Sequence, residues 1–316
     1  MSLKLSVILP VYNGMPYLPD AVESVLRQTF ADFTFIIVND GSTDGTEEYL
    51  RSLNDPRIVL INQSNEGLGA SLNTGLKRCQ TEYVARMDAD DISIPDRFVS
   101  QLRYLEAHPE IVMVGTQIEF LIGNVAQKAL AAPCGHDGIR ARLLKGRAGL
   151  CHPSLMFRTA AAVACGGYPT GIIGEDIDFC LRMCERGRAA NLNRVLFQYR
   201  LHAAQLCQAR SRELVSFNRY AAYLSTCRRM GIPEPGFKSF VQSASFIDRC
   251  RWSIEAWELT QYRTGRILLA SGKPVRGFLR LASLAVCRPL STIRRAAQTL
   301  ASLRPAHVGN DRPASS

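Results

Sequence analysis

The chain has 316 residues, of which 47% are apolar, a composition that fits a globular protein of one large or two smaller domains and does not fit a disordered chain. Its net charge of +10 is unevenly placed: residues 1–202 carry 20 Lys and Arg against 22 Asp and Glu, and residues 203–316 carry 18 against 6. The first two thirds therefore indicate a near-neutral domain, and the last third a basic region that should seek an anionic surface.

The cysteines and the apolar runs bear on location. Ten cysteines show no C-x-x-C spacing of a zinc site, which favours reduced thiols and a cytoplasmic protein. Lys4 precedes a short apolar run, but Pro10 interrupts it and no small-residue cleavage site follows, so we expect no secretory signal. No apolar run reaches the roughly 18 residues of a membrane span, so we expect no transmembrane helix.

The first ninety residues alternate apolar runs with segments of helical periodicity. This pattern predicts strands at residues 5–11, 33–38, 57–62 and 83–87, and helices at 18–28, from 46 onward, and at 67–78. Strands that alternate with helices predict right-handed crossovers and a Rossmann-like, mainly parallel α/β sheet flanked by helices.

The later elements are harder to assign. A strand at residues 111–121 is expected to rejoin the sheet, whereas residues 122–150 show no clear pattern. Helices are predicted at 159–164 and 177–186, with Gly187 as the C-cap of the second, and a strand at 196–201. Beyond residue 203 the pattern is mostly helical and basic.

Acidic residues follow two of the predicted strands. Asp40 follows the second strand, and Asp88 and Asp90 follow the fourth. The carboxyl ends of parallel strands meet at one edge, where open α/β sheets bind their ligands, so these acids should face one cleft. Two neighbouring carboxylates repel each other unless a cation lies between them, and Mg²⁺ or Mn²⁺ takes such oxygen ligands together with substrate phosphates. An acidic turn or a helix cap would also produce the Asp-x-Asp spacing.

Six motifs occur together, in an order that resembles the family 2 glycosyltransferases, which are inverting enzymes with the GT-A fold. They are SVILPVYNG at 6–14, QTF at 28–30, IVNDGSTDG at 37–45, NEGL at 65–68, MDADD at 87–91 and GEDID at 174–178. The resemblance covers residues 4 to about 205. It implies a nucleotide-sugar donor and a divalent metal, Mn²⁺ or Mg²⁺, and leaves the sugar and the acceptor open.

The resemblance implies a metal site and a donor site. Asp90 would ligate the metal directly, Asp88 would lie at the ribose and the metal, and His202, after Tyr199-Arg200-Leu201, is a plausible further ligand or a surface histidine. Asp40 would accept the N3–H of uracil, which favours a UDP-sugar, although thymine offers the same group. The other residues expected to bind the donor are Pro10, Tyr12, Asn13, Gly41, Asn65 and Arg86, the last of which would contact phosphate or hold a nearby acid.

The catalytic base is expected in the GEDID motif. An inverting reaction needs a carboxylate beside the acceptor hydroxyl, and the resemblance favours Asp176 over Glu175 for this role. Both acids also fit the first turn of a helix, where negative charge is favoured. Asp178 is expected to support that helix, and His152 to give structural support near the acceptor cleft.

The basic C-terminal region is expected to be helical from 206 to 304, followed by a disordered tail at 305–316. Phe278, Leu281 and Leu284 recur at helical spacing beside Arg276 and Arg280, as in an amphipathic helix that lies on an anionic membrane. The alternative is a helical cap that packs on the catalytic domain at 1–205. Nucleic-acid binding is disfavoured because no aromatic interleaving accompanies the basic residues.

The resemblance therefore implies an inverting, metal-dependent glycosyltransferase of bacterial-type surface polysaccharide or glycolipid synthesis, which acts on a glycan or a lipid-linked acceptor and is peripheral to the inner face of the cytoplasmic membrane. A nucleotidyltransferase is a second possibility, although such enzymes usually place a Gly-rich loop after the first strand, where this chain has Tyr12-Asn13-Gly14. A non-catalytic sugar-nucleotide binder or membrane scaffold is a third.

Overall fold

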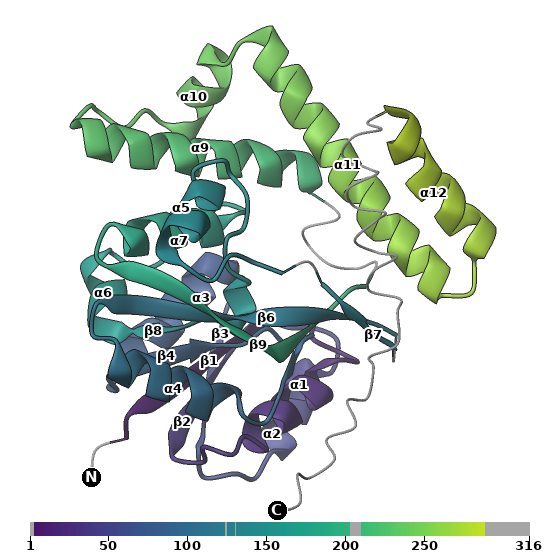
Figure 1. Cartoon of the computed structure of the whole chain (residues 1–316). Coiled ribbons are helices and arrows are strands. Elements are labelled where there is room, and N and C mark those ends of the chain that lie inside the picture. Colours follow the sequence, from purple (N-terminus) through teal and green to yellow (C-terminus); the bar gives the residue numbers. More distant parts are fainter. Residues whose placement is uncertain (1–2, 124, 130, 203–209, 288–316) are drawn as a thin grey trace, which may run out of the picture.

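The computed structural model describes residues 3–123, 125–129, 131–202 and 210–287 (Figure 1). Within them lies one nine-stranded sheet of order β3-β2-β1-β4-β8-β6-β9-β5, with β7 paired to β6. The strands are β1 (Leu5–Val11), β2 (Phe33–Asp40), β3 (Ile58–Gln63), β4 (Tyr83–Arg86), β5 (Ile92–Ser93), β6 (Ile111–Ile122), β7 (Val125–Lys128), β8 (Met156–Arg158) and β9 (Arg188–Arg200).

The first four strands form the parallel half that the sequence predicts. β1 pairs with β2 on one side and with β4 on the other, and β2 also pairs with β3. Because all four run in the same direction, the loops that follow β1, β2 and β4 open at one edge of the sheet. The helices of this half, α1 (Leu18–Leu26), α2 (Thr46–Ser52) and α3 (Leu68–Arg78), also agree with the predicted ones within two residues.

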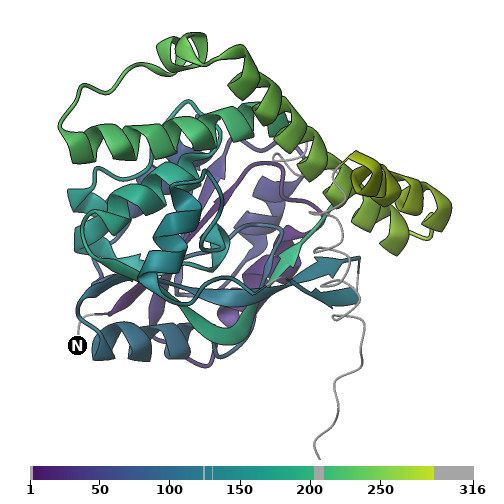
Figure 2. The same ribbon diagram turned by 45° about the horizontal axis from the view of Figure 1, so that its top comes forward.

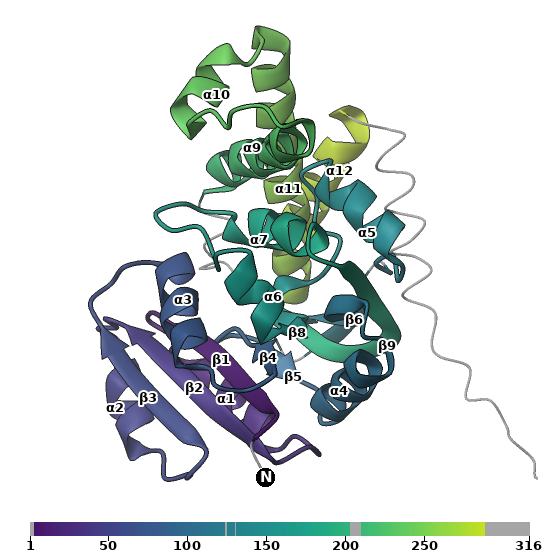
Figure 3. The same cartoon turned by 90° about the vertical axis from the view of Figure 1, so that its left-hand side faces the viewer.

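Helices cover both faces of the sheet, because successive side chains of a strand point to opposite sides. Leu5 and Leu9 of β1 pack in a core with α1, α2 and α4 (Arg97–Ala107). Ile8 packs in a second core, on the other face, with residues of α3, α5 (His136–Leu143), α6 (Thr159–Ala164) and α7 (Glu175–Cys184). Figure 3 shows α2 and α3 on opposite sides of β1–β3.

The second half of the sheet mixes directions. β8 is antiparallel to both of its neighbours, β4 and β6, whereas the long strands β6 and β9 run parallel. The predicted strand at 111–121 and helix at 159–164 are confirmed, but β5, β7, β8, α4 and α5 were not predicted. Helix α7 begins two residues earlier than predicted, so both Glu175 and Asp176 lie in its first turn.

The predicted helix cap at Gly187 is wrong. Helix α7 ends at Cys184 with Glu185 as its C-cap, and Gly187 does not have the positive φ of a glycine cap. A Cβ at this position would lie 2.3 Å from Cγ1 of Val112, so the glycine permits the close approach of this turn to β6.

The C-terminal helices are α9 (Ser211–Met230), α10 (Phe237–Ser243), α11 (Phe246–Ala270) and α12 (Pro274–Cys287). Figure 2 shows α9 and α11 lying over the part of the chain that contains the sheet, residues 3–202, called the catalytic half below. The Arg266 guanidinium stacks 4.7 Å above the ring of Phe120 and donates to the side chain of Gln127, which fixes α11 to the β6–β7 hairpin. This part of the basic region is therefore a helical cap. The predicted boundary at 205–206 and the tail at 305–316 lie outside the described residues.

None of the helices in the described part of the chain combines the length and the apolar character that a bilayer span requires.

Candidate active site

Three acidic residues cluster directly after β4. One carboxylate oxygen from each of Asp88, Asp90 and Asp91 lies within 4.8 Å of the other two. Asp91 is fully buried: its Oδ1 accepts the backbone N–H of Arg200 at 2.8 Å, and its Oδ2 has no hydrogen-bond partner among the described residues. Three negative charges so close together, with one acceptor unsatisfied, form a set of hard oxygen ligands that fits Mg²⁺ or Mn²⁺.

Asp91 was not among the predicted site residues. Burial, followed by the charges of Asp90 and Asp88, raises the pKa of Asp91 well above its ordinary value. The signal in the sequence was its position directly after Asp88 and Asp90, but a third acid in a row does not by itself show which side chains point inward.

The end of β9 is held against this cluster. The ring Nε2 of His202 lies 2.8 Å from Oδ2 of Asp90, and Nε of Arg200 donates to the backbone carbonyl of Asp90 at 2.7 Å. Together with the bond from the Arg200 N–H to Asp91, these contacts clamp residues 200–202 to the loop after β4. The structure thus brings His202 to the acids that it was expected to join.

Arg86 holds a neighbouring acid. Its side chain is 2% exposed, and Nη2 lies 2.6 Å from Oδ1 of Asp88. Burial raises the pKa of Asp88, while the charge of Arg86 opposes that increase. Of the two expectations for Arg86, the structure supports the one in which it pairs with an acid; Nε and Nη1 are buried and have no hydrogen-bond partner among the described residues.

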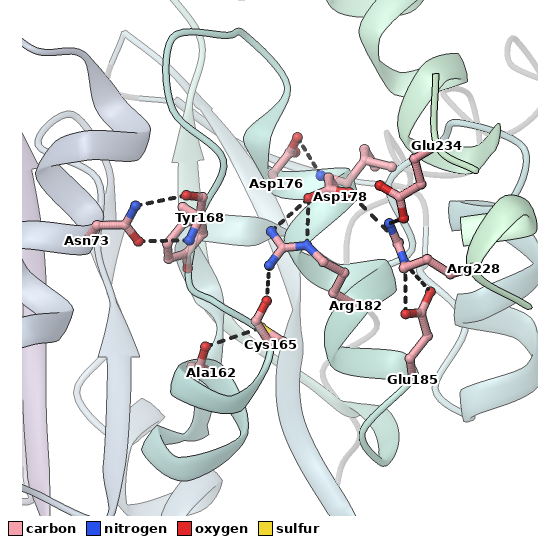
Figure 4. Close-up of polar contacts among 11 residues, drawn as sticks. Asn73, Ala162, Cys165, Tyr168, Asp176, Asp178, Arg182, Glu185, Arg228 and Glu234 are labelled. Carbon is pink, nitrogen blue, oxygen red and sulfur yellow. Dashed lines mark hydrogen bonds and ion pairs between the residues drawn. The ribbon is translucent and has the colours of Figure 1, made fainter. Parts of the chain in front are cut away.

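The first turn of α7 carries two more carboxylates, Glu175 and Asp176, the second of which is labelled in Figure 4. Glu175 is 6% exposed, and burial together with the charge of Asp176 raises its pKa to about 7. The Oδ1 atom of Asp176 accepts the N–H of Ile177 at 2.8 Å. Burial raises the pKa of Asp176, and the charges of Arg86 and of Arg263 on α11 oppose that increase.

Asp176 and the acids after β4 are electrostatic neighbours, because the charge of Asp176 raises the pKa of Asp88. Residues almost ninety positions apart in the chain therefore face the same region. Asp178, two residues further along α7, accepts from Nε of Arg182 at 2.7 Å and lies 3.9 Å from Nη2 of Arg228 (Figure 4). These contacts suit the supporting role expected of Asp178.

Asp40 ends β2 at the same edge of the sheet. It is 3% exposed, and its carboxylate accepts from Nε2 of Gln63 at 2.7 Å and from the backbone N–H groups of Glu66 and Gly67 at 2.9 and 2.8 Å. Asp40 therefore orders the loop that leads into α3. A carboxylate has about four acceptor positions, of which these contacts use three.

The other predicted donor residues lie in loops beside Asp40. Gly41 has a φ of +76°, and a Cβ there would lie 2.9 Å from the backbone N of Asn65, so glycine is required for the close approach of these two loops. Oδ1 of Asn13 accepts the N–H of Thr43 at 2.8 Å, which ties the loop after β1 to the loop after β2.

Pro10 and Tyr12 differ in their exposure. Pro10 is buried in β1 opposite Val38. Tyr12, just beyond the strand, is 52% exposed and is the more accessible of the two to a ligand.

His152 belongs to the core beneath the site. Its Nε2 lies 3.1 Å from the hydroxyl of Tyr168, and burial, followed by the charge of Arg86, lowers its pKa well below the ordinary value. Asn73 on α3 holds Tyr168 through two 2.8 Å bonds, one to its carbonyl and one from its N–H (Figure 4). A neutral, buried imidazole in this position fits the structural role that was expected.

Comparisons with known proteins agree with these observations. Residues 6–164 match the model of glycosyl transferase family 2. The putative glycosyltransferase EpsE of Bacillus subtilis (strain 168) is 33% identical over 239 residues, which cover 73% of this chain and 84% of that protein. The O-antigen biosynthesis glycosyltransferase WbnJ of Escherichia coli is 32% identical over 64% of this chain and 83% of its own length.

Two solved structures share the fold. TarS residues 1–349 of S. aureus, in complex with UDP-GlcNAc, aligns over 90% of this chain and 92% of that one, with a TM-score of 0.58 and 16% identity. The mannosyltransferase PcManGT of Pyrobaculum calidifontis, in complex with GDP-Man and Mn²⁺, aligns over 94% of this chain and 79% of its own, with a TM-score of 0.55 and 19% identity. The predicted GT-A architecture is confirmed.

The family match favours a glycosyltransferase over the nucleotidyltransferase and the non-catalytic alternatives. The chain belongs to glycosyl transferase family 2 and is a glycosyltransferase.

Proposed function

We propose that the protein is an inverting, metal-dependent glycosyltransferase that moves a sugar from a UDP-sugar to a hydroxyl of a glycan or a lipid-linked acceptor. The observation that carries this proposal is the convergence of Asp88, Asp90, Asp91 and His202 at one edge of the sheet, with Asp176 as their electrostatic neighbour. The names of two relatives, the amylovoran biosynthesis glycosyltransferase AmsE of Erwinia amylovora and WbnJ in O-antigen biosynthesis, support a role in bacterial-type surface polysaccharide or glycolipid synthesis. The location at the inner face of the cytoplasmic membrane is part of the same proposal.

On the donor side, Asp90, Asp88 and His202 would hold the metal, and Asp91 would add a third carboxylate beside those of Asp88 and Asp90. When bound, such an ion acts as a Lewis acid that stabilises the charge growing on the departing diphosphate. The contacts of Arg200 with Asp90 and Asp91 fix these ligands before the donor arrives, so little reorganisation is needed during transfer.

On the acceptor side, Asp176 is the proposed base. It must take the proton of the attacking hydroxyl, and it is more exposed than the buried Glu175 that precedes it. A pKa of about 7 would suit a general base, so the choice between the two rests on access: Glu175 is buried, at 6% exposed, and is the weaker candidate because an acceptor hydroxyl reaches it less easily. Its protonated form also reduces the repulsion that Asp176 would otherwise meet.

Asp40 supports the preference for uridine. Its remaining acceptor position would take the N3–H of uracil, and Tyr12 would lie beside the base. This arrangement also admits dTDP-sugars, and guanine offers an N1–H to the same acceptor, so the hydrolysis assay includes all three donors.

Donor hydrolysis tests the proposal. The protein is incubated with UDP-, GDP- and dTDP-sugars in Mn²⁺ or in EDTA, and the released nucleotide is measured. We expect metal-dependent release from a uridine donor, its loss in Asp90→Ala, and wild-type release in the control Asp32→Ala, which removes an exposed acid far from the site. Release that is equal in EDTA and in Mn²⁺ would contradict metal dependence. Sugar transfer by Asp176→Ala at the parent rate would contradict the assignment of the base.

A further inference from the structure

Helices α11 and α12 form a tight hairpin that projects from the catalytic half of the molecule (Figure 1). The two helices meet at a pair of glycines. A Cβ on Gly265 would lie 2.8 Å from Leu281, and a Cβ on Gly277 would lie 2.9 Å from the carbonyl oxygen of Gly265. Leu284, on the same side of α12, is 4% exposed. One apolar face of α12 is therefore fully used by its contact with α11.

A second apolar face of α12 points to solvent. Val275, Phe278 and Leu279 are 72%, 68% and 63% exposed, and their spacing of three and four residues places them on one side of the helix. The sequence predicted a single stripe of Phe278, Leu281 and Leu284. That prediction is wrong, because the three residues do not share one face. Leu281 and Leu284 face α11, and Phe278 belongs to the exposed stripe with Val275 and Leu279.

Basic residues flank the exposed stripe. Lys273, Arg276 and Arg280 are exposed, and no acidic residue occurs from Leu259 to Cys287. Arg276 and Arg280 also line a groove of about 690 Å³ between the two helices, whose apolar wall includes Trp257 and Leu279. Cations beside an exposed apolar stripe, without any acid, match phosphate headgroups above acyl chains.

We propose that the α11–α12 hairpin docks the protein on an anionic lipid surface, with Val275, Phe278 and Leu279 inserted below the headgroups and the flanking cations on the lipid phosphates. This proposal rests on the proposed function in one respect, namely that the acceptor is found at the lipid surface. Helix α11 runs without interruption from the hairpin to the side chains that contact the catalytic half, including Arg266 on Phe120. Docking would therefore hold the active site at a fixed position relative to the membrane.

Co-sedimentation of the full chain with vesicles tests the proposal. The vesicles are neutral phosphatidylcholine, or phosphatidylcholine with 30% phosphatidylglycerol, a proportion of about one anionic lipid in three chosen to give a strong surface potential. We expect binding to the anionic vesicles only, and weaker binding at high salt. Lys273→Gln with Arg276→Gln should lower the partition coefficient about 25-fold at low salt, because each cation contributes about fivefold. Phe278→Ser with Leu279→Ser should also release the protein.

Two control variants match these changes. Arg229→Gln with Arg249→Gln removes the same charge from exposed positions on α9 and at the start of α11, away from the exposed stripe of α12, and Phe246→Ser with Ile247→Ser removes apolar side chains that are 75% and 60% exposed at the far end of α11. Both control variants should sediment like the parent. The proposal would be overturned if a control variant lost as much vesicle binding as the matched variant of the stripe or its flanking cations. Equal binding of the parent to neutral and anionic vesicles would also overturn it.

A fluorescence measurement leaves the exposed stripe of α12 and its flanking cations unchanged. The chain has two tryptophans, so Trp252→Phe leaves Trp257, in the groove, as the reporter. We expect a blue shift of its emission with anionic vesicles and none with inorganic phosphate. An unchanged spectrum with anionic vesicles would overturn the docking site, and a shift produced by inorganic phosphate alone would show a simple anion site. Neither experiment contains a donor sugar, so failure here is distinct from failure of the proposed transferase reaction.

Discussion

Glu175→Gln should stabilise the protein, and the gain should depend on pH. In the folded state burial and the neighbouring Asp176 raise the pKa of Glu175 from 4.5 to about 7. An acid with a raised folded-state pKa is neutral and harmless below its unfolded value, and it destabilises the fold as the pH rises above that value. The penalty grows between pH 4.5 and about 7 and is constant above that range.

The magnitude follows from the size of the shift. At about 1.4 kcal/mol per pKa unit, ionising Glu175 costs the fold about 3 kcal/mol above pH 7 and about 1 kcal/mol at pH 5.5. Glutamine keeps the shape of the side chain and an oxygen that can accept the N–H of Gly174, as Glu175 does at 3.2 Å. Urea unfolding in EDTA at several pH values, with the exposed Glu110→Gln as control, measures the difference. A gain that is equal at pH 5 and pH 8.5 would refute the reasoning.

Three further changes test the fold and the donor loop. Arg97→Met should lower the free energy of unfolding by about 2–5 kcal/mol, because the fully buried guanidinium donates to the carbonyls of Arg86 and Pro153. A urea midpoint close to that of the parent would contradict this prediction. Gly187→Ala should cost about 1–3 kcal/mol through the contact with Val112, whereas Gly135→Ala, which meets nothing within 4 Å, should be neutral; equal thermal midpoints would argue against the clash. Asp40→Asn should speed hydrogen exchange at the Glu66 and Gly67 amides and weaken UDP binding, since an amide cannot accept all three bonds; unchanged exchange would show that Asp40 does not order this loop.

The parallel half of the fold could be predicted because its local signals agree. The apolar runs that became β1, β2 and β4 are buried on both faces, and each is followed by a loop with glycine or acidic residues. The same regularity predicts from the sequence alone that Asp40, Asp88 and Asp90 lie at one edge of the sheet. His202 and Asp176, by contrast, were expected at the site through the resemblance to a family and not through a pattern of their own.

The remaining parts of the fold depend on contacts between residues that are far apart in the sequence. β5 has two residues, Ile92 and Ser93, and β8 has three, so neither carries a periodic signal, and each is defined by its partner strand. Arg97 is charged and yet fully buried, which no local propensity predicts. The face of α12 was misassigned because its sequence is apolar on two sides, and only the position of α11 decides which side is covered.

The most direct test of the central claim is calorimetric titration of UDP into the protein, with and without Mn²⁺. In the proposed reaction, acids from the β4 loop bind a cation that receives the nucleotide diphosphate, while the acid on α7 acts on the acceptor. We expect Mn²⁺-dependent binding by the parent, loss of that dependence in Asp90→Asn, and unchanged binding in Asp176→Asn. Binding of UDP with Mn²⁺ by Asp90→Asn at the affinity of the parent would contradict the proposed reaction.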